Sequence, residues 1–264
     1  MTILTNKKIF LVIIGSLFLV FGFFAYKNKV NFFKKEPISV IFDFDSTIVK
    51  TESIVDMLSL ALGNDKKKIQ EIEKITNDAM NGLLTPRQSM EKRLKFATID
   101  KNIVNKITAK AQKNIVDGLD DLIKHLQQKN IQIYVVSGGF KEIIIPTTNL
   151  LGIKNENVYA NNFVYNKNVV SGVEDNVLFE KQGKVKLIKK LKKEGKIKGK
   201  TIMIGDGYTD LEVGLHKATD DFIAFTGVVE REKVVVDAKK NGFAIAKNIT
   251  ELSKTLNDKV KNFA

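Results

Sequence analysis

The sequence predicts an α/β fold, a Rossmann-like parallel sheet covered by helices, with a helical cap inserted after the first strand and a hydrophobic helix at the N-terminus. Three observations predict it. Short apolar runs alternate with segments of helical periodicity along most of the chain, and this alternation is typical of a parallel sheet with helices on both faces. Helical periodicity alone fills residues 49–114, and residues 9–26 form an uncharged apolar stretch.

The N-terminal stretch predicts a membrane anchor. Residues 9–26 are dominated by Ile, Leu, Val and Phe and have lysines on both sides, and their length is near the minimum for spanning a bilayer. A cleaved signal peptide and a core or extension helix are alternatives, although no convincing small-residue cleavage site is present. Slightly more positive charge follows the segment than precedes it, which favours a cytoplasmic location for the rest of the chain. An exported or soluble protein is the alternative.

Residues 1–37 therefore comprise the hydrophobic segment and a basic linker, and residues 38–264 the main domain. The apolar run 38–42 predicts its first strand. The inserted cap, residues 49–114, is expected to contain helices over 52–61, 66–80, 86–97 and 103–114. Pro86 stands in the first turn of one of these helices, where proline is tolerated.

The remaining elements alternate in type. Helices are expected over 118–128, 140–150, 184–193, 210–216, 230–239 and 249–257. Strands are expected over 131–136, 157–160, 201–204, 221–225 and 243–246. Residues 163–173 predict a hairpin that turns at 166–168.

Polar side chains gather just past the predicted strand ends. In an open α/β sheet, ligands bind outside the carboxyl ends of the strands, so side chains from different strands are expected to converge there. Crowded carboxylates repel one another and need a cation, and oxygen ligands favour Mg²⁺. The residues concerned are Asp43, Asp45, Ser137, Asp206 and Asp210.

Composition excludes several other kinds of chemistry. The formal net charge is +13, but the lysines are scattered over helices and no basic-aromatic surface is apparent, so no nucleic-acid partner is predicted. Cysteine is absent, which excludes disulfides and thiol chemistry. The only two histidines, His125 and His216, fall on predicted helices and do not support a histidine-rich metal site.

Four segments in a fixed order resemble the haloacid dehalogenase superfamily of phosphotransferases, and within it the phosphoserine phosphatase-like branch. The first is Asp43-Phe44-Asp45-Ser46-Thr47. It is followed by Ser137-Gly138-Gly139, by Lys184 at the start of a helical pattern, and by Gly205-Asp206-Gly207-Tyr208-Thr209-Asp210. The resemblance extends from about residue 38 to about residue 256.

The resemblance implies roles for the catalytic residues. Asp43 would be the nucleophile that forms an aspartyl-phosphate, and Asp45 the general acid and base. The Ser137 hydroxyl and the Gly138 backbone would bind phosphoryl oxygens, with Gly138 at the N-terminus of the next helix. Lys184 would offset negative charge; Lys181 is the alternative lysine.

The same resemblance implies a Mg²⁺ site and a position near the phosphoryl group. Asp206 would bind the ion directly and Asp210 would support it, while Asp43 contributes its carboxylate and Asp45 its backbone carbonyl. Thr209 matches a position near the phosphoryl group, with a helix N-cap as the equal alternative.

Substrate choice would be determined by other residues. Glu52 and Arg93 match the residues that hold the amino and carboxylate groups of phosphoserine. Met80 matches an apolar pocket residue, and Arg231 a basic residue near the site. The family's aromatic residue six positions after that methionine is Pro86 here, a departure that affects the serine pocket rather than the chemistry.

These expectations define a Mg²⁺-dependent phosphomonoesterase that converts phosphoserine to serine and phosphate, and hence a serine-producing enzyme. The first alternative is the same chemistry on another small phosphomonoester: a phosphorylated amine, amino acid or sugar. A catalytically idle binding protein with this fold is the alternative from another class. The sequence does not indicate an oligomeric state.

Overall fold

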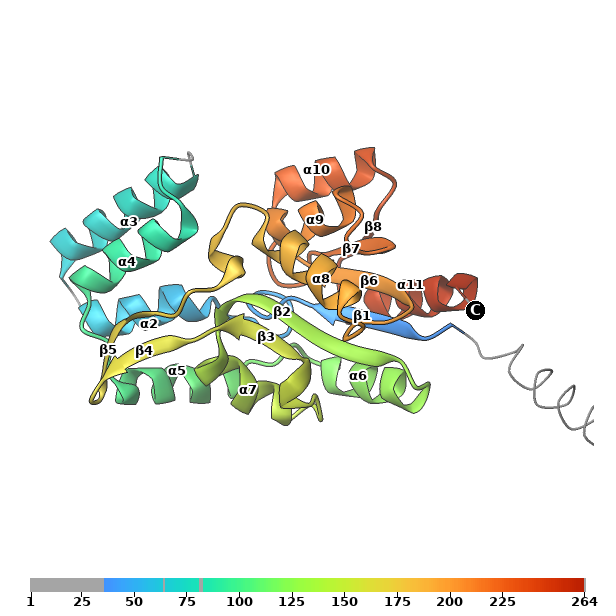
Figure 1. Cartoon of the computed structure of the whole chain (residues 1–264), viewed down its shortest axis with the longest axis horizontal. Helices are drawn as coiled ribbons and strands as arrows, with labels where there is room; N and C mark the ends of the chain where they lie inside the picture. The colour runs from blue at the N-terminus through green and yellow to red at the C-terminus, as the bar shows by residue number, and fades with distance from the viewer. Residues whose placement is uncertain (1–35, 64, 81–82, 264) are drawn as a thin grey trace, which may run out of the picture. The chain divides into compact units, whose positions relative to one another are not determined.

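The computed structural model describes residues 36–63, 65–80 and 83–263, without the side chains at positions 73, 76, 77, 79 and 80 (Figure 1). Residues Pro37–Phe263 form one compact unit. The hydrophobic segment 9–26 lies outside the described residues, so the predicted N-terminal helix has no counterpart among them.

A six-stranded parallel sheet organises this unit. Its strand order within the described residues is β3-β2-β1-β6-β7-β8, so β1 lies in the middle beside β2 and β6. The strands are β1 (Ile38–Phe42), β2 (Gln132–Phe140), β3 (Val158–Asn161), β6 (Lys200–Gly205), β7 (Asp221–Phe225) and β8 (Ala244–Ala246). The carboxyl ends of β1 and β6 are therefore neighbours at the centre of one sheet edge.

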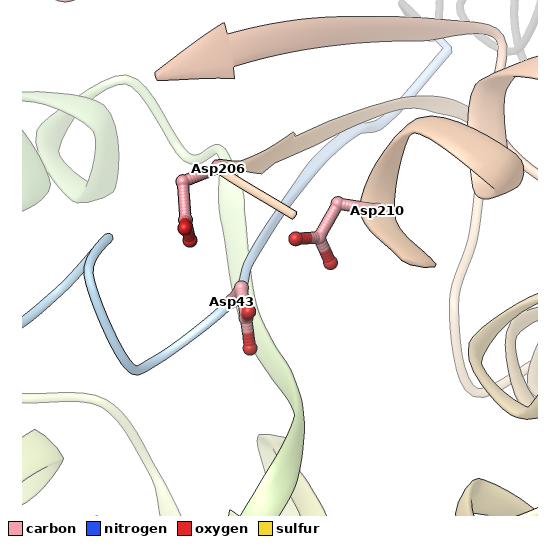
Figure 2. A group of neighbouring side chains, drawn as sticks. All are labelled: Asp43, Asp206 and Asp210. Atoms are coloured by element: carbon pink, nitrogen blue, oxygen red, sulfur yellow. The ribbon is translucent and has the colours of Figure 1, made fainter. Parts of the chain in front are cut away.

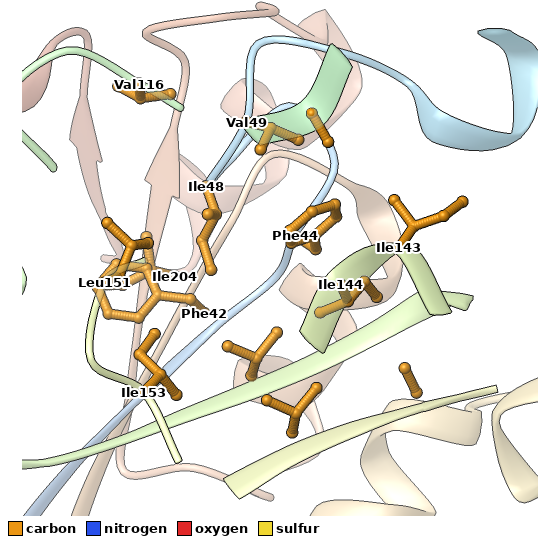
Figure 3. Packing of buried hydrophobic residues seen from close by; sticks show 14 of the residues in the cluster. Phe42, Phe44, Ile48, Val49, Val116, Ile143, Ile144, Leu151, Ile153 and Ile204 are labelled. Atoms are coloured by element: carbon orange, nitrogen blue, oxygen red, sulfur yellow. The ribbon is translucent and has the colours of Figure 1, made fainter. Parts of the chain in front are cut away.

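Both faces of the sheet are apolar. Side chains of successive strand residues point to opposite faces, and apolar residues occupy both sets of positions. Val40 and Phe42 pack into one buried cluster, and Ile41 between them packs into the other. Figure 3 shows Phe42 and Phe44 inside the first cluster. Fully buried strands read as continuous apolar runs for this reason, and Phe44, two positions past β1, is fully buried as well.

Helices cover the two faces in separate groups (Figure 1). The first cluster contains side chains of α6 (Leu119–Gln128), α7 (Lys141–Asn149) and α11 (Ile249–Phe263). The second contains side chains of α8 (Gly183–Lys193), α9 (Tyr208–Leu215) and α10 (Glu232–Lys240). Short 3₁₀ turns at Asn155–Asn157 and Val177–Phe179 precede β3 and α8.

The segment between β1 and α6 is helical, as the periodicity predicts. It contains α2 (Ser53–Leu62), α3 (Lys66–Met80), α4 (Pro86–Phe96) and α5 (Lys101–Lys113). Pro86 is the first residue of α4, and Thr85 caps that helix by accepting from Gln88 N–H. The helix α5 contributes Val104, Ile107 and Ala111 to the first core cluster. The cap boundary 49–114 stays a prediction.

The predicted hairpin is confirmed and is separate from the main sheet. β4 (Phe163–Asn166) and β5 (Val169–Val173) pair antiparallel, and Lys167 in the turn has a φ of 55°. The helix predicted over 140–150 is confirmed to within one residue, but the strand predicted over 131–136 ends later than expected. β2 continues through Ser137-Gly138-Gly139 to Phe140, and α7 starts only at Lys141.

The prediction of membrane anchoring is also corrected. No helix among the described residues is long and apolar enough to cross a bilayer. Helices such as α8 instead bury one side and place lysines in the last turn, as expected where a helix covers a sheet. The anchored, cytoplasm-facing arrangement is therefore not retained.

Candidate active site

Three of the acidic side chains predicted from the sequence, those of Asp43, Asp206 and Asp210, converge at the carboxyl ends of β1 and β6 (Figure 2). Asp43 directly follows β1, and its backbone N–H donates to Ile204 O in β6 at 2.9 Å. Asp206 directly follows β6, and Asp210 lies in the first turn of α9. One carboxylate oxygen from each of the three lies within 4.8 Å of the others.

Gly205 allows this close approach. A Cβ atom at this position would lie 2.3 Å from Cγ of Asp210, so any side chain would collide with the carboxylate. Asp210 Oδ2 also accepts from Gly207 N–H at 3.1 Å and closes the first turn of α9. The turn between β6 and α9 therefore holds Asp210 toward Asp43.

Lys184 is the buried cation of the site. Its Nζ lies 2.9 Å from Asp43 Oδ1 and 2.6 Å from Asp210 Oδ1, and its side chain is 7% exposed. Burial lowers the pKa of Lys184, but the Asp210 and Asp43 carboxylates outweigh it and hold the pKa above its ordinary value. Lys184 is thus a fixed positive charge, whereas the alternative, Lys181, is exposed.

Asp206 is held by two side chains. Oδ1 accepts from the Thr47 hydroxyl at 3.2 Å, and Oδ2 accepts from Arg231 Nε at 2.7 Å. Arg231 also reaches Glu52 Oε1, at 3.0 Å, and the same oxygen accepts from Ser46. One guanidinium therefore bridges a candidate metal ligand and the carboxylate predicted to hold the substrate amine.

Asp45 does not belong to the acidic triad and is held by Ser53. Its Oδ1 accepts from the backbone N–H and the hydroxyl of Ser53. Burial raises the pKa of Asp45 to about 7, with a smaller contribution from Asp43 and against the Ser53 hydrogen bonds. A carboxyl group with such a pKa can give and take a proton near neutral pH.

Ser137 is buried close to Asp45. Both Ser137 Oγ and Asp45 Oδ2 lie against Gly139, at 3.4 and 3.6 Å from the position that a Cβ of Gly139 would occupy. Ser137 Oγ accepts from Gly139 N–H at 3.1 Å, which leaves the hydroxyl hydrogen free to donate. Gly138 is exposed, and a Cβ there would meet nothing within 4 Å, so a ligand can approach this backbone.

Other predicted residues are not brought into the cluster. Arg93, on α4, is partly buried, and its guanidinium donates only to Ser89 O of its own helix among the described residues. Met80 is the last residue of α3, and its side chain is not among those that the structure describes. Thr209 is exposed on α9 and is not its N-cap, because Gly207 occupies that position.

Sequence reasoning gave no role to Thr47 or Ser53, which hold Asp206 and Asp45. Thr47 ends the first motif and Ser53 follows it closely, and hydroxyl side chains beside carboxylates are natural hydrogen-bond donors. Their position next to the acidic pair was the available signal. Which carboxylate each hydroxyl reaches depends on how the chain turns after β1, where Ser46 has a φ of 53°.

The residues present fit a Mg²⁺ ion. Asp43, Asp206 and Asp210 supply only oxygen ligands, as this ion prefers. Burial, and then the Asp43 carboxylate, raises the pKa of both Asp206 and Asp210, against the opposing cations Arg231 and Lys184. A divalent cation would relieve this mutual repulsion.

Comparison with known proteins agrees with this geometry. The sequence model of the haloacid dehalogenase-like hydrolases matches residues 39–216. The phosphoserine phosphatase of Homo sapiens is 32% identical over 203 residues, which cover 76% of this chain and 87% of the human protein. A solved structure of a phosphoserine phosphohydrolase-like protein from Francisella tularensis is similar with a TM-score of 0.70 and 33% identity, over 82% of this chain and 98% of that one.

A solved structure of a phospho-aspartyl intermediate analogue of phosphoserine phosphatase is also similar, with a TM-score of 0.65 and 27% identity over 84% of this chain and 99% of that one. This chain belongs to the haloacid dehalogenase-like hydrolases and is a phosphoric monoester hydrolase. Its cofactor is Mg²⁺. Within the family it belongs to the phosphoserine phosphatase-like branch.

Proposed function

We propose that this enzyme hydrolyses O-phosphoserine to serine and phosphate through an aspartyl-phosphate on Asp43. The observation that carries the proposal is the contact between Asp43, at the end of β1, and the buried Lys184, beside an acidic triad suited to Mg²⁺. The substrate part is supported by relatives that are phosphoserine phosphatases. With phosphoserine as its substrate, the enzyme would produce serine.

In the first half-reaction the Asp43 carboxylate attacks phosphorus, and the bond from phosphorus to the serine oxygen breaks. Asp45, in its protonated form, donates its proton to that departing oxygen. Lys184 neutralises charge on Asp43, and the Ser137 hydroxyl donates to a phosphoryl oxygen. Mg²⁺, when bound, supplies further neutralisation of negative charge around the phosphoryl group.

In the second half-reaction, water displaces the Asp43 carboxylate from phosphorus. Asp45, now ionised, takes a proton from a water molecule whose oxygen attacks phosphorus, and the bond to the Asp43 oxygen breaks. Phosphate leaves, and both carboxyl groups return to their starting states. The hydrogen bonds from Ser53 hold the Asp45 carboxylate in one position through both steps.

Recognition of serine is assigned to one acid and one base. Glu52 would hold the ammonium group and Arg93 the carboxylate. Burial lowers the pKa of Arg93, and no carboxylate among the described residues pairs with its guanidinium. A partly buried cation without an acidic partner costs free energy that a substrate carboxylate would recover.

The substitution Arg93→Ala tests this assignment. We expect kcat/KM for phosphoserine to fall about tenfold or more, since a charge-assisted hydrogen bond is lost, while kcat/KM for phosphoethanolamine, which lacks a carboxylate, stays within about threefold. Arg87→Ala is the matched control, because Arg87 is on the same helix but already pairs with Glu91 and Asp175. Equal losses on both substrates would remove Arg93 from substrate recognition.

The second candidate is hydrolysis of a different small phosphomonoester. Two observations favour it: Glu52 Oε1 already accepts from Arg231 and Ser46, and Pro86 replaces the family's aromatic residue. Phosphate release from a panel of phosphorylated amines, amino acids and sugars distinguishes the candidates. A clear preference for a substrate without a carboxylate would keep the chemistry and reject phosphoserine.

A further inference from the structure

Asn161, the last residue of β3, lies beside the segment Ser137-Gly138-Gly139 and has no role in the function proposed above. Its side chain is completely buried. Its Nδ2 donates to Gly138 O at 2.8 Å. The acceptor is a carbonyl, so the amide can only be oriented with its nitrogen toward Gly138.

The segment is irregular at this point and needs such support. In the pairing of β2 with β3, Val136 is opposite Tyr159 and Phe140 is opposite Asn161. Three residues of β2 therefore lie opposite a single residue of β3, which is a bulge. A bulge leaves backbone groups without partners in the sheet, and the Asn161 amide supplies the partner for one of them.

Asn161 acts on the same peptide unit that orients Ser137. The Gly138 carbonyl and the Gly139 N–H belong to one planar trans peptide, in which they point in opposite directions. Asn161 holds the carbonyl end, and the N–H end donates to Ser137 Oγ at 3.1 Å. Fixing one end therefore aims the other at the serine oxygen.

We propose that Asn161 is a positioning residue of the phosphoryl site, which aims the Ser137 hydroxyl by holding the Gly138–Gly139 peptide. This inference rests on the proposed role of Ser137. With the Gly139 N–H donating to Oγ, the serine oxygen is held in place and its hydroxyl hydrogen stays available to a phosphoryl oxygen. Loss of the Asn161 amide frees the peptide to rotate and weakens phosphate binding without removing any group that touches phosphate.

The chain offers a matched control for this inference. Asn157, just before β3, donates through its Nδ2 to Ile133 O of β2 at 2.9 Å. Asn157→Leu and Asn161→Leu therefore remove the same kind of amide-to-carbonyl hydrogen bond between the same parts of the fold. Only the bond made by Asn161 reaches the bulge.

The experiment is calorimetric titration of the full chain, with Mg²⁺ present, by inorganic phosphate. We expect Asn161→Leu to weaken phosphate binding about tenfold, while Asn157→Leu binds as the wild type does. Because Asn161 acts through Ser137, Asn161→Leu should weaken binding little further in a Ser137→Ala background. Asn161→Ala, which removes the amide without adding bulk, replaces Asn161→Leu if that variant does not fold.

Equal weakening by Asn157→Leu and Asn161→Leu, or additive effects of Asn161→Leu and Ser137→Ala, would overturn the inference. The phosphomonoester activity of the wild type is measured in parallel. Absence of hydrolysis would reject the proposed function, whereas the phosphate titration tests the positioning role independently of any substrate.

Discussion

At the residue scale, a single buried lysine determines the electrostatics of the site. Lys184 Nζ contacts both Asp43 and Asp210, and no other lysine within the described residues forms an ion pair with either carboxylate. Its charge offsets part of the repulsion among three crowded carboxylates. In the proposed reaction it also offsets the charge of the phosphoryl group as Asp43 attacks.

Replacing this lysine separates the two candidates that the sequence left open. We expect Lys184→Met to reduce kcat/KM at least about a hundredfold, as loss of a preorganised charge at a reacting centre does, and Lys181→Met to change it less than about threefold. Steady-state phosphate release, with the thermal midpoint of each variant as a folding check, gives the answer. The reverse order of effects would make Lys181 the functional lysine.

At the scale of elements, the turn from β6 into α9 places the metal ligands. Asp206 and Asp210 are four positions apart, and the turn brings both toward Asp43 because Gly205 leaves room for the Asp210 carboxylate. A larger side chain at position 205 would therefore move a metal ligand.

We expect Gly205→Ala to lower the free energy of unfolding by roughly 1–3 kcal/mol, since the new methyl group overlaps Asp210, and to weaken Mg²⁺ binding. Gly172→Ala is the control, because a Cβ at Gly172 in β5 would meet nothing within 4 Å. Denaturant unfolding and calorimetric Mg²⁺ titration measure the two effects. Unchanged Mg²⁺ affinity in Gly205→Ala would show that the turn adapts.

The sequence predicts these elements well where one local signal decides them. The periodicity of residues 66–80 gives the bounds of α3, and the apolar run 38–42 gives β1. Prediction from the sequence fails where partners distant in the sequence determine the bounds of an element. For example, β2 continues through two glycines because β3 pairs with it across a bulge. For the same reason the motifs predicted Asp43 and Asp206 but not that Arg231 would bridge Asp206 and Glu52.

At the scale of the whole molecule, the acidic site reduces the stability of the fold in the absence of a cation. Burial raises the pKa of Asp206 and of Asp210, which means that their charged forms are unfavourable in the folded protein. An ion that binds the folded state alone shifts the folding equilibrium toward it. Function and stability are therefore linked through the same three carboxylates.

Mg²⁺ at a hundred times its dissociation constant should stabilise the fold by about 2.7 kcal/mol, equivalent to an increase in Tm of about 5 °C or more. Asp206→Asn should reduce this increase strongly, because a charged ligand is lost. Asp117→Asn is the control, since Asp117 is an exposed partner of Lys50 away from the cluster. Thermal unfolding with Mg²⁺ and with a chelator measures the shift, and an equal shift in both variants would place the ion elsewhere.

The most direct test of the account is to locate the phosphoryl group on the enzyme during turnover. The full chain is mixed with phosphoserine and Mg²⁺, quenched in acid, digested and analysed by mass spectrometry. We predict one phosphoryl group on the peptide that contains Asp43, and none in the Asp43→Asn variant, which should also release no phosphate. A phosphoryl group on another residue, or phosphate release that survives Asp43→Asn, would contradict the account.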